Sequence, residues 1–418
     1  MSAEIICVGT ELLLGDILNS NAQYLAKELA RLGIPHYYQS VVGDNPGRIH
    51  QVVEMAIARS SILIFTGGLG PTPDDLTTET LAAFFQTPLV EHPEVLQDIT
   101  EKFAMRRREM TPNNRKQALL PQGATVLPNP SGTAPGMIWQ PKPDLTLLTF
   151  PGVPSEMRRM WQETAVPFLQ AQGWGKQIIH SRLLKFWGIG ESTLATKVAD
   201  FFDSPNPTVA PYASAGEVRL RVSAKAPSEG EALQLIEPIA AQIQAIAGWD
   251  YFGHDEQTLA TVVGELLRDR QQTLSVAESC TGGGLGEMLT QVAGSSDYFQ
   301  GGVISYANTV KTQLLGVSPE LLTQLGAVSE PVAKQMALGV QKQLGSDWSL
   351  SITGIAGPGG GSDHKPVGLV YIGLAAPDQT VDIFEYRFGQ ERDRATIRYM
   401  SACNALDRLR RKLLDSPS

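Results

Sequence analysis

Cysteine, positive charge and long hydrophobic runs are all scarce in this sequence, and each shortage excludes a class of protein. The 418 residues include only three widely spaced cysteines, Cys7, Cys280 and Cys403, so neither a disulfide framework nor a zinc site is expected. No uncharged apolar stretch is long enough to span a bilayer, and the first residues contain no basic segment followed by an apolar core. We therefore expect a cytoplasmic protein without a membrane partner.

The charge balance argues against a general nucleic-acid binder. The chain has 34 Lys and Arg against 43 Asp and Glu, a formal net charge of -9. Non-specific binding of nucleic acids depends on basic side chains that neutralise phosphates, so no direct nucleic-acid partner is expected. Any nucleotide ligand should be small and held by local groups. The length and a hydrophobic content of 42% predict two or three domains with packed cores.

The first part of the chain, residues 1–171, alternates apolar strand patterns with helical ones. This alternation predicts an α/β domain with a doubly wound parallel sheet, in which ligands bind beyond the carboxyl ends of the strands. Expected strands cover residues 4–9, 36–42, 60–65 and 145–150, and expected helices cover residues 21–32 and 49–59.

A glycine-rich segment, TGGLGPTPDD at residues 66–75, follows the third of these strands. Its glycines, Gly67, Gly68 and Gly70, would let backbone N–H groups approach a phosphate. Asp74 and Asp75 cannot bind phosphate themselves, so we expect them to hold a divalent metal that bridges to the phosphate oxygens. The alternative is a surface turn in which Asp74 or Asp75 caps the helix that starts near residue 76.

Residues 175–252 have a different rhythm, typical of a small α+β module. The turn at residues 188–191, GIGE, is similar to the glycine loop of RNA-binding KH modules. The loop is not basic, which favours a structural spacer over RNA binding.

Residues 255–418 predict another α/β domain with polar loops at its strand ends. Ser279, Tyr306 and Lys311 follow two of these strands and are a plausible Ser-Lys hydrolase set, with Thr353 and the glycine-turn amides as oxyanion donors. The residue types alone favour a simpler interpretation, in which Ser279 caps the next helix, Tyr306 packs and Lys311 is a solvated surface cation. Cys280 is a rival nucleophile, although no histidine or cationic partner is visible that would ionise its thiol.

Several motifs taken together resemble the CinA family, the competence/damage-inducible proteins, over the full length of the chain. The motifs are GTELLLG at residues 9–15, Asn21, TGGLGPTPDD at 66–75, Asn129 with GTAPG at 132–136, PGVPSEM at 151–157, AESCTGG at 277–283, YANTVK at 306–311 and TGIAGPGG at 353–360.

The resemblance implies three domains and two activities. The N-terminal domain would have the molybdopterin-binding fold and act as a metal-dependent ADP-ribose pyrophosphatase, the middle domain would be KH-type, and the C-terminal domain would be a nicotinamide mononucleotide deamidase. The implied catalytic residues of the deamidase are Ser279, Tyr306, Lys311, Thr353 and an arginine. Spacing back from Ile397-Arg398 selects Arg394, with Arg392 as the alternative, because the segment GQERDR at 389–394 departs from the family pattern.

The resemblance also implies contacts to the two substrates. The expected substrate-binding residues are Thr10, Glu11, Asn21, Gly67, Gly68, Gly70, Asn129, Gly132 and Gly152 in the N-terminal domain, and Thr281, Gly282, Gly283, Gly354 and Gly357 in the C-terminal domain. Glu11 is also a weaker candidate for a metal ligand or for orienting water.

We expect Mg, Mn or Co at the N-terminal site, with K as an optional addition, and no organic cofactor. The expected partners are ADP-ribose, nicotinamide mononucleotide and a second copy of the chain in a homodimer. Two alternatives stay open from the sequence: a molybdopterin-binding carrier, which would prefer the pterin to ADP-ribose, and a non-enzymatic scaffold in competence or DNA repair.

Overall fold

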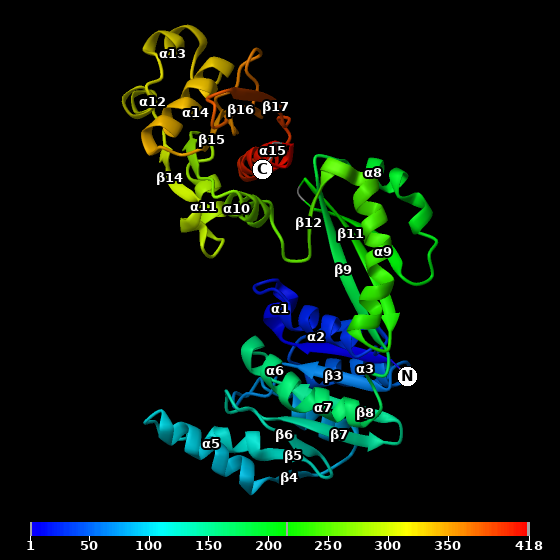
Figure 1. The fold of residues 1–418 in the computed structure, drawn as a ribbon. Helices are drawn as coiled ribbons and strands as arrows, with labels where there is room; N and C mark the ends of the chain where they lie inside the picture. Colours follow the sequence, from blue (N-terminus) through cyan, green and yellow to red (C-terminus); the bar gives the residue numbers. More distant parts are fainter. Residues whose placement is uncertain (1, 215, 416–418) are drawn as a thin grey trace. The chain divides into compact units, whose positions relative to one another are not determined.

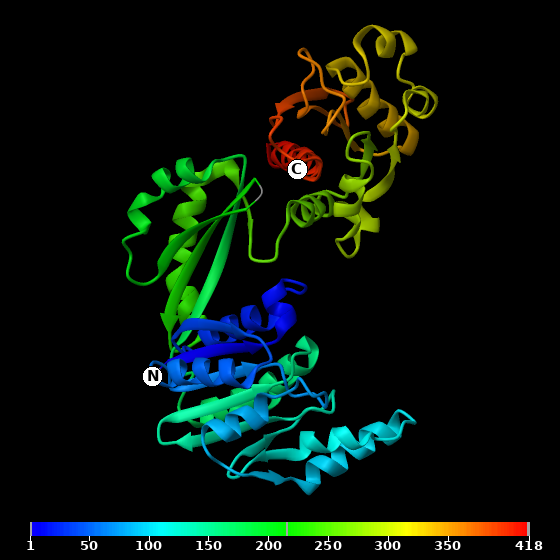
Figure 2. The same ribbon diagram turned by 180° about the vertical axis from the view of Figure 1, so that it is seen from behind.

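The computed structural model describes residues 2–214 and 216–415, and these contain three separate main sheets (Figures 1 and 2). The chain divides into two compact units, one reaching to His180 and including Ser223–Leu235, the other made of Ser181–Val222 and the chain from Ile236 onward. The predicted α/β architecture is confirmed by these sheets and the helices that pack against them. Across residues 2–214 and 216–415, no helix is both long and apolar enough to cross a bilayer.

The N-terminal sheet has six strands in the order β2-β1-β3-β8-β7-β6. Its first four strands are parallel, and β1 is buried along its whole length, as expected of a central parallel strand. Two further strands at one edge, β7 and β6, run antiparallel, and the sequence did not predict them. The strands are β1 Ala3–Val8, β2 His36–Val42, β3 Ile62–Thr66, β6 Thr125–Leu127, β7 Gly136–Lys142 and β8 Leu145–Phe150, with a separate pair β4 Leu89–Glu91 and β5 Leu119–Pro121.

Helices cover both faces of this sheet, and each face has its own apolar core. Local chemistry defines where they begin: the Asn19 side chain accepts from the Ala22 N–H at the start of α2, and Asn45 accepts from Arg48 N–H at the start of α3. The helices are α1 Thr10–Leu14, α2 Ser20–Arg31, α3 Pro46–Ile57, α4 Thr77–Phe84, α5 Pro93–Met105, α6 Pro154–Met160 and α7 Val166–Ala171, with the 3-10 helix η1 Pro112–Ala118 and the π-helical turn η2 Trp161–Ala165.

The middle sheet has the order β10-β11-β9-β12. Every second residue of β11 is buried, and the other face is partly exposed. The fourth strand, β12, was not predicted, because four residues directly after a helix are too few to show a strand period. The elements are β9 Ile178–Trp187, α8 Glu191–Lys197, η3 Ala199–Phe201, β10 Thr208–Ser214, β11 Glu217–Ala226, α9 Glu229–Ala247, η4 Gly248–Asp250 and β12 Tyr251–His254.

The C-terminal sheet has the order β14-β13-β15-β16-β17. Strands β14, β13 and β15 are parallel, so their carboxyl ends lie at one edge, while β16 and β17 run antiparallel. The elements are α10 Leu259–Asp269, β13 Leu274–Glu278, α11 Gly284–Thr290, η5 Ser295–Asp297, β14 Phe299–Ile304, α12 Asn308–Leu315, α13 Pro319–Leu325, α14 Glu330–Leu344, β15 Trp348–Gly354, β16 Leu369–Ala375, β17 Val381–Arg387 and α15 Arg394–Asp415.

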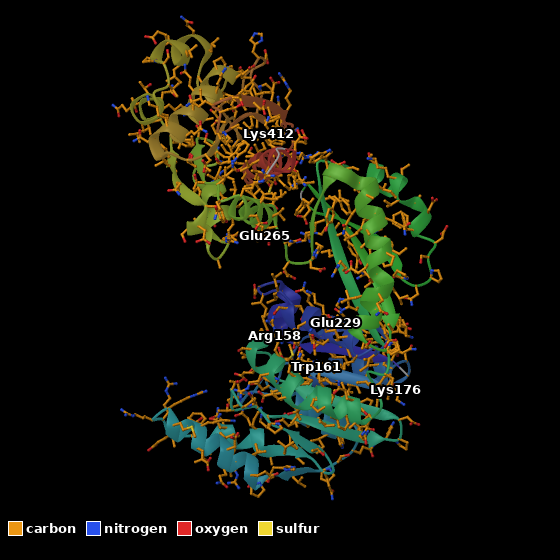
Figure 3. All side chains as sticks on the ribbon, in the orientation of Figure 1. Arg158, Trp161, Lys176, Glu229, Glu265 and Lys412 are labelled. Carbon is orange, nitrogen blue, oxygen red and sulfur yellow. The ribbon has the colours of Figure 1, made fainter. Side chains whose placement is uncertain are left out.

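Trp161 is the largest fully buried side chain of the N-terminal core, and its ring lies 5.9 Å from that of Phe150 (Figure 3). Replacing it with alanine removes a large apolar group and leaves a cavity. We expect Trp161→Ala to destabilise the N-terminal unit by about 3–5 kcal/mol. Calorimetry of the full chain should show one transition moving to lower temperature. Trp249→Ala is the matched control, because that side chain is 49% exposed; equal shifts for both variants would contradict the packing described.

Candidate functional sites

A cleft of about 510 Å³ lies at the carboxyl ends of β1, β3 and β8. The glycine-rich turn after β3 forms part of its wall, as does the turn after β8. Of the predicted residues, the structure brings these to the cleft: Glu11, Asn21, Gly67, Gly68, Gly70, Asp74, Asp75 and Gly152. The sequence analysis missed two further carboxylates on the wall, Asp44 and Glu156. Asp44 follows the end of a predicted strand, a signal that could have identified it.

The glycines after β3 are required by the backbone conformation. Gly67 and Gly68 have φ values of 100° and 66°, and a Cβ on Gly67 would overlap the carbonyl oxygen of Val8. The Gly67 N–H donates to the carbonyl of Phe150 and is not free for a ligand. In the part of the chain that the structure describes, the N–H groups of Gly68, Leu69 and Gly70 have no acceptor. These three amides can therefore donate to phosphate oxygens.

The two predicted metal ligands differ in their surroundings. Asp75 Oδ2 accepts from the N–H and the hydroxyl of Thr72, which holds the carboxylate in place. The Thr72 hydroxyl and the backbone N–H of Asp74 lower the pKa of the exposed Asp74 carboxyl, so it is ionised at neutral pH. Neither aspartate caps α4, whose N-cap residue is Leu76 without a side-chain hydrogen bond. The alternative of a simple capping turn was therefore wrong.

Asn21 and Thr10 have separate roles. Asn21 Nδ2 donates to the carbonyl of Gly152 at 2.8 Å, which leaves Oδ1 buried and without a partner. Thr10 is not on the cleft wall; its N–H and hydroxyl both donate to Asp44 Oδ2 at 2.9 Å.

Asn129 and Gly132 also lie off the wall. Asn129 organises its own loop by accepting from the N–H of Gly132 and donating to Glu156 Oε2. Asn129 and Gly132 therefore do not line the cleft themselves, and Asn129 holds the wall residue Glu156.

The cleft fits a cation better than a free anion. Its wall carries five carboxylates, Glu11, Asp44, Asp74, Asp75 and Glu156, and no Lys, Arg or His. Carboxylate and amide oxygens are the ligands that hard divalent cations prefer. Within residues 2–214 and 216–415, however, no three His, Cys, Asp or Glu side chains are close enough together to hold a metal by themselves.

The second site lies at the carboxyl ends of β13 and β14. Ser279 follows β13 directly, and Lys311 comes from the first turns of α12. Lys311 Nζ lies 3.1 Å from Ser279 Oγ, 2.6 Å from the carbonyl oxygen of Ser305 and 3.3 Å from that of Tyr306. Ser279 does not cap α11, whose N-cap is Gly283. The interpretation of Ser279 as a cap and Lys311 as a surface cation was therefore wrong.

The Lys311 amine is almost completely buried, with 1% exposure, and has no carboxylate partner among the described residues. Burial lowers the pKa of Lys311 below its ordinary value of 10.5. A neutral amine has two N–H donors and one lone pair. The two carbonyls of Ser305 and Tyr306 can accept the two donors, which leaves the lone pair for the Ser279 hydroxyl proton. This is the arrangement that a general base requires.

The glycine turn after Ser279 holds a carboxylate of the chain itself. The buried Glu278 side chain accepts from the N–H groups of Gly283, Leu285 and Gly286 at 2.8–3.1 Å. These amides were expected to face an anionic ligand or an oxyanion, and they are occupied. In the described chain, the N–H groups of Cys280 and Thr281 donate to no other residue, so they are the available oxyanion donors in this turn.

The hydroxyl of Thr353 donates to the carbonyl of Ala327 at 2.8 Å and is fully buried. The structure therefore places its side chain against the backbone of another loop.

Tyr306 is 63% exposed, and its hydroxyl lies 3.3 Å from Arg394 Nη2. Arg394 also donates to the carbonyl of Gly357 at 2.7 Å, whereas Arg392 lies against the sulfur of Met400. Of the two candidate arginines, Arg394 is the one beside Tyr306.

Arg398 had no predicted role, although it lies one helical turn beyond Arg394 on α15. Its Nε and Nη2 both donate to the carbonyl of Thr281, at 3.2 and 2.6 Å. Helix α15 thus holds two loops, through Arg398 and through Arg394. No local sequence signal identifies a contact between residues 117 positions apart.

Gly282, Gly283, Gly354 and Gly357 shape the loops around Ser279. Gly282, Gly283 and Gly357 have positive φ values, and a Cβ on Gly354 would lie 2.6 Å from the Val370 side chain. These positions allow tight turns and close packing.

Family models match the chain in three consecutive parts. They describe a probable molybdopterin binding domain at residues 4–171, a damage-inducible protein CinA KH domain at 181–253 and a CinA C-terminal domain at 256–413. A CinA-like protein of Rippkaea orientalis is 71% identical over 414 residues, which are 99% of this chain and 100% of the relative. A CinA-like protein of Trichormus variabilis is 70% identical with the same coverage. The chain belongs to the CinA family. This CinA-family chain therefore aligns with its relatives over all three of its parts.

The thiol next to Ser279 gives a direct test of the site geometry. Burial raises the pKa of Cys280 to about 12, so this thiol is protonated at neutral pH and unreactive. We expect iodoacetamide at pH 7.5 to leave Cys280 unmodified in the folded protein and to label it fully in guanidinium chloride, as measured by peptide mass spectrometry. Rapid labelling of Cys280 in the folded CinA-family chain would contradict the burial described.

Proposed function

We propose that the protein is a hydrolase with two independent sites. The C-terminal site would deamidate nicotinamide mononucleotide to nicotinate mononucleotide and ammonia, and the N-terminal site would cleave ADP-ribose to AMP and ribose 5-phosphate. The observation that carries the proposal is the 3.1 Å contact between the buried amine of Lys311 and Ser279 Oγ. An amine whose pKa is lowered by burial, beside a serine hydroxyl, is an arrangement for nucleophilic catalysis.

In the proposed deamidation, neutral Lys311 takes the hydroxyl proton of Ser279 while Oγ attacks the amide carbon. The oxygen of the tetrahedral intermediate accepts from the free N–H groups of Cys280 and Thr281. Lys311 then returns the proton to the departing ammonia. Water, deprotonated by the same amine, hydrolyses the acyl ester and regenerates Ser279. Arg394 and the Tyr306 hydroxyl are exposed at the site and suit the phosphate of the substrate.

In the proposed cleavage of ADP-ribose, the free amides of Gly68, Leu69 and Gly70 donate to the pyrophosphate oxygens. The wall residues Asp74 and Asp75 would hold a divalent metal, and Glu11 would orient the attacking water. When bound, the metal supplies positive charge for the phosphate oxygens. The structure supports this assignment through the cation-free, carboxylate-rich wall of the cleft.

Deamidation should depend on Ser279 and on the neutral form of Lys311. We expect Ser279→Ala, Lys311→Ala and Lys311→Arg each to reduce kcat by several powers of ten, because arginine keeps the charge and cannot act as a base. Cys280→Ala should retain most of the activity. Since burial lowers the pKa of Lys311, kcat/KM should rise with pH through a midpoint below 10.5 and be lost as the pH falls further. Ammonia release measured against pH tests this; full activity of Ser279→Ala would refute the assignment.

The two activities should separate cleanly when the N-terminal site is impaired. We expect Asp75→Asn to reduce AMP release from ADP-ribose at least 100-fold, since the asparagine carbonyl can still accept from Thr72 while one negative charge is lost. A chelator should have the same effect, and neither should alter deamidation by the same sample. Equal loss of both activities on chelation would contradict the two-site proposal.

A further inference from the structure

A second cavity of the C-terminal part, of about 360 Å³, has no role in either proposed activity. Helix α15, strands β16 and β17 and the short helix η4 supply its walls, and all of them belong to one compact unit. Leu374 on its wall pairs with Leu350 near the start of β15, whereas Ser279 follows the carboxyl end of β13. Because β13 and β15 are parallel, the cavity and Ser279 lie at opposite ends of these strands.

Three basic side chains from the last turns of α15 line the cavity, and two of them are already paired with carboxylates. Arg411 pairs with Asp407 at 2.7 Å. Lys412, which is labelled in Figure 3, pairs with Asp382 at 2.8 Å. Arg408 differs, because among the described residues no carboxylate lies within ion-pair distance of its guanidinium. Its positive charge is therefore available to a ligand.

Neutral groups hold the Arg408 guanidinium in place. Its Nε donates to the Tyr386 hydroxyl at 2.7 Å, and its Cζ lies 4.5 Å from the centre of the Phe384 ring. Nη1 and Nη2 have no acceptor within residues 2–214 and 216–415, although the side chain is partly buried. A planar guanidinium with two free outer nitrogens is suited to bidentate binding of a carboxylate or a phosphate.

Trp249 gives the cavity an exposed aromatic ring. The residue is 49% exposed, although its backbone is fixed by the buried Arg410, which donates to its carbonyl. Indole rings bind flat aromatic compounds by stacking, and they do so with little regard to the identity of the ring. Ligand pockets measure about 300–1,000 Å³, so a cavity at the lower end of this range fits a small compound.

We propose that this cavity binds a small, flat aromatic compound that carries one carboxylate or phosphate. The ring stacks on Trp249, and the anion accepts from Nη1 and Nη2 of Arg408. Asp415 on the same wall disfavours a second anionic group. A neutral ring leaves Arg408 without a counter-ion, and an inorganic anion leaves Trp249 exposed, so both parts of the ligand are required. The site does not depend on the proposed hydrolytic reactions.

A fluorine label on Trp249 reports binding at this cavity alone. The chain has six tryptophans, so the fluorine resonance of Trp249 in fluorotryptophan-labelled protein is assigned by its loss in Trp249→Phe. Titration in EDTA with benzoate or AMP should shift this resonance in a saturable way, with Kd below about 1 mM for at least one of them. Benzamide, the uncharged counterpart of benzoate, and inorganic phosphate should give no saturable shift. Tighter binding of AMP would identify a nucleotide phosphate, and tighter binding of benzoate an aromatic carboxylate.

Charge variants test the role of Arg408. Arg408→Gln should weaken binding by about 10- to 100-fold, because hydrogen bonds to a charged group are lost. Arg408→Lys keeps the charge without the planar pair of donors and should have intermediate affinity. Lys334→Gln, on the exposed side of α14, changes the net charge as Arg408→Gln does and should have no effect. Arg394→Gln should also leave the titration unchanged, because Arg394 lies at the other end of α15.

The absence of a saturable shift with both benzoate and AMP would overturn the proposal. So would binding of benzamide as tight as that of the anionic compound, or unchanged affinity in Arg408→Gln. The comparison of charged with uncharged ring needs only the wild-type side chains, so it decides the charge requirement even if the Arg408 variants fail to fold. Absence of both hydrolytic activities from wild-type protein would refute the proposed function and leave this site unaffected.

Discussion

The burial of one lysine amine without a carboxylate is the constraint on which the C-terminal site depends. An ammonium ion at this position would lose its hydration and gain only neutral acceptors, so burial favours the neutral amine. In the proposed deamidation, the lone pair of that amine can accept a proton from Ser279 only if this serine is held against it. Three hydrogen bonds hold Ser279 in this position. The Ser279 N–H donates to the Ile352 carbonyl, the Glu278 carboxylate accepts from the N–H of Gly283 in the next turn, and Arg398 donates to the carbonyl of Thr281.

The same helix that supplies Arg398 also contacts the backbone of η4 and β12. Near its other end, Arg410 is 2% exposed, pairs with Asp407 at 2.7 Å and donates to the carbonyls of Trp249 and Tyr251. A buried ion pair of this kind costs desolvation and is costly to break. Helix α15 is therefore fixed at both ends, and the position of the loops around Ser279 depends on contacts made about three to four turns away.

The sequence predicted the elements better than it predicted the contacts between them. The apolar strand patterns, the helical patterns and the glycine turns identified most elements of the N-terminal part, including β8 with its observed limits. The short strand β12 and the antiparallel edge at β7 were missed, because pairing direction is decided by distant partners. Glu278 stood inside a recognised motif, yet its function is visible only once the turn folds back onto it. The contact of Arg398 depends on packing across elements, for which one sequence contains no signal, whereas the position of Asp44 just after a strand was a signal that was overlooked.

Carboxylates of the chain itself lie at the glycine-rich turns of both sites, but their contacts differ. In the C-terminal turn, the Glu278 carboxylate accepts from the backbone N–H groups and so holds the turn in place. In the N-terminal cleft, the carboxylates lie beside the glycines and leave the amides of Gly68, Leu69 and Gly70 free. A glycine-rich turn after a strand is thus insufficient to predict an anion site, because the anion can be part of the protein.

Glu278 and Ser279 are consecutive residues whose side chains point to different places. The Glu278 side chain enters the glycine turn, and the Ser279 side chain contacts Lys311. Neighbouring residues of an extended strand point to opposite sides, so inserting one residue in β13 would move Glu278 to the place that Ser279 holds beside Lys311, and deleting one would move Cys280 there. After an insertion the carboxylate would face the lysine amine, which would favour the ammonium form and remove the proposed base. Homologous chains can accordingly differ in composition along β13, while gaps in an alignment should be absent from this strand.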